Sequence, residues 1–333
     1  MSTVARLRAL VAVADSGSVR MAAGRLSVTE SAVSAALAAL AREVRVPLAE
    51  RDGRGLRLTA AGASYAEYAR KILGLHEEAL AAARSGRDPE QGTVRVAAVT
   101  TAGEQLLPRQ LASFLSAHPT VDLRLEVGSS ERMWAMFAAH EADVMIGGKP
   151  PAGVADAVIR ATRPNLLVVV AAPAVAQVIT ASDLGAARWL QREAGSATRS
   201  HGEALLASLE AEPSRLTLGS SGAVIACAVA GLGATLAPRE AVRHHLATGE
   251  LEEVPVPGTP LRRPWRAVTH RQPPPAAVLL VSHLVADHGW RAPRGAALAD
   301  SLPVALPAAM VMRGSAVAPG RRGGIGCQLS CRP

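Results

Sequence analysis

Short polar side chains at Glu30, Ser31 and Ser34 have the types and the spacing to bind the edges of DNA bases. In a helix these three positions share one face, because residues three and four apart lie on adjacent turns. Serine hydroxyls and a carboxylate can bond base edges, and their small size lets a helix backbone approach the floor of the major groove. The structural alternative for the same residues is a helical hairpin inside a bundle.

Two short amphipathic helices joined by a tight turn are predicted between Ser18 and Val44, and these helices would position the polar face. This arrangement is typical of a DNA-binding helix-turn-helix. We therefore expect the segment from Ser18 to Leu37, including Thr29, to contact DNA. Apolar residues at helical spacing mark the buried side of each helix: Val19, Ala22, Ala23 and Leu26 in the first, and Val33, Leu37, Leu40 and Val44 in the second.

The flanking residues predict a complete winged helix-turn-helix domain. Upstream, apolar residues at positions 7, 10, 11 and 14 predict a third helix. Downstream, a turn-rich segment predicts a two-stranded wing that carries Arg51, Arg54 and Arg57, and guanidinium groups suit contacts with phosphate or with the minor groove. A solvated basic hairpin is the alternative. Thr59 then caps a predicted linker helix from Ala60 to about residue 84.

The first 90 residues resemble the LysR-type transcriptional regulators of bacteria. The resemblance rests on LRALVAVADSGSVRMAAGRLSVTESAVSAALAAL, on the wing RDGRGLRLTAAG and on the linker helix. Four positions depart from the family pattern, and they concern the affinity for DNA and the preferred bases more than the fold. These are Ala35 in place of arginine, Ala41 in place of glutamate, Arg45 in place of glycine and Ala49 in place of phenylalanine.

From Gly92 onward, short apolar strands alternate with helices, which predicts an α/β architecture with a largely parallel sheet. The outline resembles the two-lobed, periplasmic-binding-protein-like effector domain of the same family. The expected organisation is a DNA-binding domain at 1–62, a dimerisation helix at 60–90 and an effector domain at 91–290. Lobe I would comprise 91–162 and 266–290, and lobe II 163–265. The tail at 291–333 is rich in Ala, Pro, Gly and Arg and is predicted to be disordered.

Hydroxyl groups follow several predicted strands at the point where a helix begins, which is where open α/β sheets collect ligands. Free helix amides there favour a small anionic metabolite, and the resemblance implies that these positions line an effector cleft. The alternative is that the hydroxyls only cap helices. The candidate residues are Thr100, Thr101, Ser129, Arg192, Gly195, Ser196, Thr198, Ser220 and Ser221.

Charge and composition agree with a DNA-binding protein without establishing one. The net charge of +8 divides into +3 for residues 1–91, zero for 92–290 and +5 for 291–333. No signal peptide is evident at the N-terminus, and glycines interrupt the uncharged stretch 216–238, so we expect a cytoplasmic protein without a membrane span. Cys227, Cys327 and Cys331 lack zinc-site spacing, so neither a metal nor a cofactor is expected.

The sequence favours a regulator over two alternative functions. A solute-binding lobe pair would explain 92–290 but not the first 90 residues. An enzymatic function is disfavoured because the sequence has neither a phosphate loop nor a nucleophile elbow. The expected partners are promoter DNA, a small anionic effector and a second copy of the chain. The family resemblance implies a dimer of dimers, and several segments look most like carbon-fixation-operon regulators of actinobacteria. Residues proposed for the dimer seam of the linker helix are Tyr65, Ala69, Ile72, Ala79 and Ala83.

Overall fold

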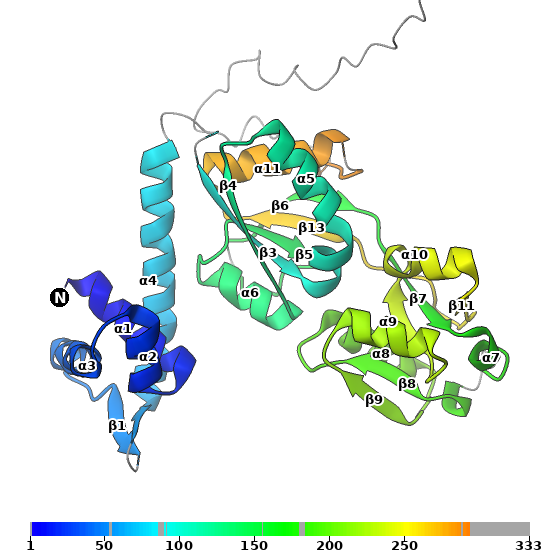
Figure 1. Cartoon of the computed structure of the whole chain (residues 1–333), viewed down its shortest axis with the longest axis horizontal. Coiled ribbons are helices and arrows are strands. Elements are labelled where there is room, and N and C mark those ends of the chain that lie inside the picture. The colour runs from blue at the N-terminus through cyan, green and yellow to red at the C-terminus, as the bar shows by residue number, and fades with distance from the viewer. Residues whose placement is uncertain are drawn as a thin grey trace, which may run out of the picture. The chain divides into compact units, whose positions relative to one another are not determined.

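The computed structural model describes residues 2–52, 55–85, 90, 92–154, 156–179, 184–287 and 289–293. Its N-terminal part has three helices, a two-stranded wing and one long helix (Figure 1). The wing strands pair antiparallel, with Glu50 opposite Arg57. The predicted winged helix-turn-helix with its linker helix is confirmed. In chain order the elements are α1 (Thr3–Ser16), α2 (Val19–Leu26), α3 (Glu30–Val44), β1 (Ala49–Asp52), β2 (Gly55–Leu58) and α4 (Ala60–Ser85).

A small aliphatic core holds the winged domain together. Leu10, Val33 and Leu40 are fully buried within it, and α4 contributes Ala66 and Ala69. Side-chain caps define where the helices begin, since Ser18 accepts from the amide of Met21 and Thr59 accepts from the amide of Gly62. The predicted apolar stripes of α2 and α3 therefore face one shared core.

Arg45 ends α3 in the left-handed backbone region, with φ 58°. Glycine adopts this conformation without a steric penalty, whereas a side chain places its Cβ too close to the following carbonyl. The glycine that the family pattern carries here therefore has a conformational reason. Arginine at this position costs on the order of 1 kcal/mol of stability.

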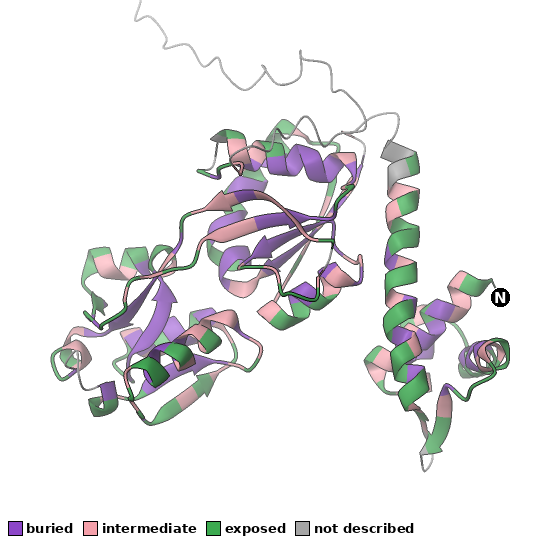
Figure 2. Cartoon of the chain, turned by 180° about the vertical axis from the view of Figure 1, so that it is seen from behind, coloured by how far each residue is buried: buried purple, intermediate pink, exposed green. Residues whose placement is uncertain are grey.

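The first sheet of the effector domain has the strand order β4-β3-β5-β13-β6. The strands β3, β4 and β5 are parallel, and β13 returns antiparallel between β5 and β6. Buried residues are concentrated in β3 and β5, as Figure 2 shows. The elements are β3 (Thr93–Val99), the π-helix η2 (Ala102–Leu106), α5 (Leu107–Ala117), β4 (Asp122–Gly128), α6 (Ser130–Ala138), β5 (Val144–Gly147), β6 (Val158–Arg163), β13 (Trp265–Thr269) and α11 (Pro275–Asp287).

The second lobe is built around β7 (Leu166–Ala171), which pairs antiparallel with β10, β11 and β12, while β8 and β9 form a parallel pair. No helix within the described residues has the length and hydropathy needed to cross a membrane. The remaining elements are α7 (Pro173–Ala176), the 3-10 helix η3 (Leu184–Ala186), β8 (Trp189–Arg192), α8 (Ala197–Ser208), β9 (Arg215–Leu218), α9 (Ser221–Val229), β10 (Thr235–Pro238), α10 (Arg239–Thr248), β11 (Glu252–Glu253) and β12 (Leu261–Arg262).

The chain crosses between the lobes at residues 164–165, which join β6 to β7, and again at 263–264, which join β12 to β13. The segment 158–163 forms β6, which pairs with β13 along its length. His244 and His245 lie in α10, where Val242 and Leu246 mark the apolar side of the helix.

Three aromatic rings are stacked in the first lobe, with His270 between Phe137 and His140. The ring of His270 lies 4.1 Å from that of Phe137 and 4.0 Å from that of His140, measured between centroids. Ligand atoms of His140, Asp156 and His270 lie within 4.8 Å of one another. The two imidazole planes are inclined by only 15°, however, so their nitrogen lone pairs run side by side and do not converge on one ion. This packing favours a structural role for the cluster.

Replacing His270 by phenylalanine should make the protein more resistant to mild acid. Burial and the neighbouring His140 lower the pKa of His270 to about 4, whereas an unfolded histidine titrates near pH 6.5. Between these values the unfolded chain binds more protons than the folded one, so stability is lost as the pH falls from 6.5 towards 4. Going from pH 7.5 to 5, the parent should lose about 2 kcal/mol more than His270→Phe.

Urea-induced unfolding followed by circular dichroism at pH 7.5 and 5 measures this difference. Phenylalanine preserves the ring stack with Phe137, so the two proteins should have similar stability at pH 7.5. An equal loss of stability in both proteins at pH 5 would show that His270 does not carry the acid sensitivity.

Candidate functional site

The exposed face of α3 consists of small and polar residues. Glu30, Ser31, Ser34, Ala35 and Ala38 are all exposed, while the opposite side of the helix is buried in the winged-domain core. Among the predicted contact residues, Thr29 is the N-cap of α3, and its hydroxyl accepts from the amide of Ala32 and lies 2.9 Å from that of Ser31. The side chains available to a base edge are therefore those of the first two turns.

The two described arginines of the wing, Arg51 and Arg57, differ in their surroundings. Arg51 is exposed on β1. Arg57 is exposed on β2, but its guanidinium donates to the carboxylate of Glu50 on the facing strand at 2.6 Å. The negative charge of Glu50 therefore opposes the approach of a phosphate to Arg57. Arg54 lies outside the described residues.

The linker helix exposes only part of the apolar face that was expected, namely Ile72, Ala79 and Ala83. Ala69 is fully buried and Tyr65 is partly buried, because both pack against the winged-domain core of the same chain. The large apolar side chains that α4 exposes are Tyr68, Ile72 and Leu75, with exposed fractions of 63%, 48% and 48%. Both sets have helical spacing, so the sequence alone did not distinguish the face that packs within the chain from the free one.

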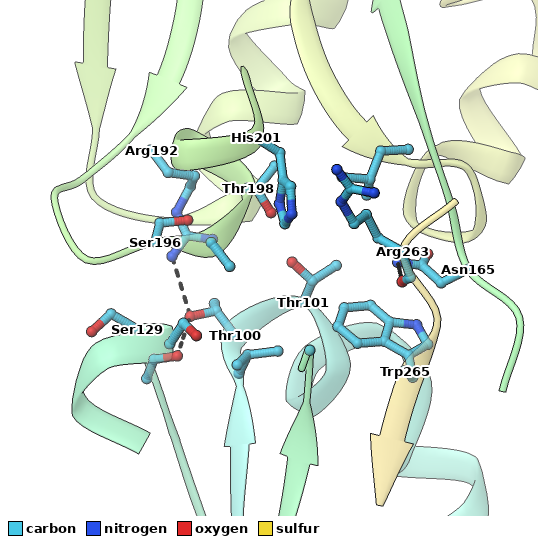
Figure 3. Close-up of a pocket in the computed structure, with 16 residues that line it drawn as sticks. Thr100, Thr101, Ser129, Asn165, Arg192, Ser196, Thr198, His201, Arg263 and Trp265 are labelled. Carbon is cyan, nitrogen blue, oxygen red and sulfur yellow. Dashed lines mark hydrogen bonds between the residues drawn. The ribbon is translucent and has the colours of Figure 1, made fainter. Parts of the chain in front are cut away.

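A pocket of about 50 Å³ lies where the two lobes face each other. In Figure 3, Thr100, Thr101 and Ser129 from the first lobe lie opposite Arg192, Ser196 and Thr198 from the second. A cavity of about 10–15 Å³ on this measure holds one water. The pocket therefore accommodates a group of a few heavy atoms, such as a carboxylate or a phosphate.

Arg192 is the buried charge of this pocket, with a residue exposure of 5%. Its Nη2 donates to the hydroxyl of Thr100 at 3.2 Å, and its Nη1 donates to the hydroxyl of Ser221. Its Nε and Nη2 also form a forked pair with the carboxylate of Glu193, at 2.7 and 2.6 Å. Because Thr100 belongs to the other lobe, Arg192 bridges the pocket.

The hydroxyls predicted to bind an effector divide into two groups. Ser129 and Ser220 cap helices, since they accept from the amides of Arg132 and Ala223. Ser196 stands before α8 without a side-chain hydrogen bond to that helix. Helix capping, the alternative left open by the sequence, thus applies to Ser129 and Ser220 but not to Ser196.

Three of the candidate residues do not line the pocket, and the reason differs for each. Ser220 is occupied in capping α9. The hydroxyl of Ser221 is buried between Arg192 and Thr101, 3.2 Å from the latter. Gly195 has φ 79°, and a Cβ there would lie 2.7 Å from the carboxylate of Glu131, so the glycine allows its loop to approach the first turn of α6 closely. The residues that do line it are Thr100, Thr101, Ser129, Arg192, Ser196 and Thr198.

Among the other lining residues, four with large polar or aromatic side chains were not identified from the sequence: Asn165, His201, Arg263 and Trp265. Asn165, Arg263 and Trp265 lie at the two crossings between the lobes, so the position of those crossings was the signal available. Burial and the charge of Arg263 both lower the pKa of His201, which keeps that imidazole neutral at pH 7. Trp265 also borders a second cavity of about 350 Å³ beside α10.

Comparison with known proteins finds two matching family models in succession. Residues 4–63 match "Bacterial regulatory helix-turn-helix protein, lysR family", and residues 87–289 match "LysR substrate binding domain". The chain is 33% identical to the HTH-type transcriptional regulator CbbR of Rhodospirillum rubrum, over 74% of this chain and 83% of that protein. It is 32% identical to the RuBisCO operon transcriptional regulator of Acidithiobacillus ferrooxidans, over 80% of this chain and 87% of that protein.

Solved structures show the same fold. A full-length OxyR variant from Pseudomonas aeruginosa superimposes with a TM-score of 0.62 at 22% identity, covering 86% of this chain and 95% of that one. At this identity the likeness concerns the fold alone. The fold, the two family models and the named relatives all point to the same group of proteins.

Proposed function

The chain belongs to the LysR family of bacterial transcriptional regulators, and from this premise we propose that α3 contacts promoter DNA and that the interlobe pocket binds a small anionic effector. The relatives are named as transcriptional regulators, which supports a regulatory and non-enzymatic role in the cytoplasm. One of those relatives is named as a regulator of the RuBisCO operon, which makes a carboxylase operon the first promoter to test.

The exposed face of α3 is the observation that carries the DNA-binding part of the proposal. Its small side chains allow close approach to base edges, and Glu30 can accept a hydrogen bond from a cytosine amine. Arg51, an exposed arginine of the wing, has the charge to contact a neighbouring phosphate. The winged domain thus has the parts needed for both base recognition and backbone attachment.

Buried Arg192 at the pocket is the observation that carries the effector part. A cation with 5% exposure and hydroxyls around it favours a carboxylate or a phosphate. The amides at the start of α8 add positive potential, because no side chain caps them. A ligand bridging Thr100 and Ser196 would touch both lobes, so its binding can change their relative orientation.

We propose that two copies pair through α4 along Tyr68, Ile72 and Leu75. These residues recur at positions i, i+4 and i+7, which is the spacing of a helix-pairing seam. The seam therefore differs from the one proposed from the sequence, and it retains Ile72. A dimer places two copies of α3 on one DNA molecule, and two dimers would extend the footprint.

Thr100→Val should weaken the response to effector by roughly tenfold, because a hydrogen bond involving a charged group contributes about 1.5 to 3 kcal/mol. The test uses the promoter of a carboxylase operon from the genome that encodes this protein, footprinted with and without a panel of two- to four-carbon phosphate esters and carboxylates. The parent should show a footprint that changes with at least one of these anions. Ser196→Ala should shift the response in the same direction.

Ser116→Ala is the matched control, because its hydroxyl is exposed on α5 and bonds only its own helix in the described structure. A Thr100→Val variant that responds like the parent would remove this hydroxyl from the site. A footprint insensitive to the whole panel at millimolar concentration would overturn the anion-binding role.

A further inference from the structure

The carboxylate of Glu193 occupies the hydrogen-bonding edge of Arg192 that an anion would otherwise use. A guanidinium binds carboxylates and phosphates best through two parallel N–H donors. In Arg192 the Nε and Nη2 donors already point at the two oxygens of Glu193, at 2.7 and 2.6 Å. The remaining described bonds of this guanidinium go to the hydroxyls of Thr100 and Ser221.

Glu193 is an ionised and partly exposed partner of the buried charge of Arg192. Arg192 is buried, so its attraction for an anion is little screened by solvent. The side chain of Glu193 is 32% exposed and follows directly on β8, so it can turn outward without moving the strand. Burial would raise the pKa of Glu193, but its hydrogen bonds with Arg192 outweigh this and lower the pKa, so Glu193 is ionised at pH 7.

We propose that Glu193 is an internal competitor of the effector and sets which anions the pocket registers. The inference rests on the proposed anion-binding role of the pocket. A monoanion that displaces Glu193 only exchanges one carboxylate partner of Arg192 for another, and it loses translational freedom in doing so. A dianion such as a phosphoryl group brings more charge than it displaces, so its binding is favourable.

Other cations near the pocket do not remove this competition. The guanidinium of Arg199 is paired with Glu203 at 2.8 Å. His201 stays neutral because burial and the charge of Arg263 lower its pKa. Arg263 is largely exposed at the rim, where its charge is screened more strongly than that of Arg192. The pair formed by buried Arg192 and half-buried Glu193 therefore dominates the affinity for an anion.

Glu193→Gln should convert the pocket from one that registers only dianions to one that registers monoanions as well. The probes are sulfate, whose double charge does not titrate, and acetate, each titrated up to about 10 mM against the full chain at constant ionic strength. The readout is the melting temperature, which rises when a ligand binds the folded state. The parent should respond to sulfate and not to acetate.

In Glu193→Gln the concentration of sulfate that gives half the shift should fall at least about tenfold, and acetate should now give a saturable shift. Glu193→Ala removes the competing side chain altogether and should change both responses in the same direction. Glu203→Gln is the matched control, because it removes an equal charge from α8 but leaves the fork on Arg192 intact. Its sulfate response should stay within about threefold of the parent.

The outcomes separate this inference from the function it rests on. If Glu193 merely positioned Arg192, both variants would bind sulfate more weakly, and that result would overturn the inference. If Glu193→Gln and Glu193→Ala respond to sulfate as the parent does, Glu193 is not a competitor and the inference is overturned. The anion-binding role of the pocket would still stand. If sulfate shifts neither the parent nor any variant, the anion-binding role of the pocket is itself wrong.

Discussion

Ser34→Glu is expected to weaken binding to promoter DNA by roughly a hundredfold without changing the oligomeric state. Ser34 is exposed at the centre of the α3 face, one turn beyond Glu30 and Ser31. A second carboxylate on this face is repelled by the phosphates on both sides of the major groove, and it excludes the contact that the serine can make. Electrophoretic mobility shift at fixed salt measures the affinity, because binding to DNA depends strongly on salt.

Ser116→Glu and Ser34→Ala are the controls for this prediction. The first introduces the same charge on the exposed side of α5, and it should leave DNA affinity within about twofold of the parent. The second removes the hydroxyl without adding a charge and should change the preferred bases more than the affinity. Parent-like affinity in Ser34→Glu would remove this face of α3 from the DNA interface.

Arg192→Met is expected to remove the response to anionic effectors, with affinity falling by about a hundredfold. The substitution keeps much of the side-chain volume but deletes the buried charge and its bonds to Thr100 and Glu193. Loss of a charged hydrogen-bonding group in a desolvated site costs about 1.5 to 3 kcal/mol for each bond to the ligand. Titration with sulfate, followed by the melting temperature, should show no saturable shift.

Arg199→Met is the control for Arg192→Met, because it also removes an arginine close to the pocket. The guanidinium of Arg199 is engaged with Glu203 and contacts the carbonyl of Arg192 at 3.5 Å, so its loss should reduce the sulfate response only a few-fold. DNA binding without effector should persist in both variants, since the winged domain is unchanged. A full sulfate response in Arg192→Met would place the anion elsewhere.

The parts of the structure that were predictable are those determined by local patterns. The stripe Val33, Leu37 and Leu40 has helical periodicity and is buried as predicted. Thr100 and Ser196 were found because each lies where a strand gives way to a helix, and the carboxyl ends of parallel strands collect ligands. Such features depend on neighbours within a few residues, so they can be deduced without knowing the tertiary fold.

The parts that were missed depend on contacts between distant segments. Asn165 and Trp265 line the same pocket although 100 positions separate them, and no periodicity relates them. The outward face of α4 was assigned only in part, because the sequence does not show whether Ala69 packs against its own domain or against a partner helix. Gly195 has the loop position of a ligand contact, but the approach of Glu131 from the other lobe determines its role.

The position of Trp265 gives the molecule an internal optical reporter. Of the four tryptophans in the sequence, Trp134, Trp189 and Trp290 have exposures of 5%, 2% and 3%. Trp265 is half-buried, and its indole borders both the pocket and the larger cavity beside α10. Quenching of intrinsic fluorescence by a dissolved small molecule therefore arises chiefly at the crossing between the lobes. Opening and closing of the lobes can thus be followed by its emission without attaching a dye.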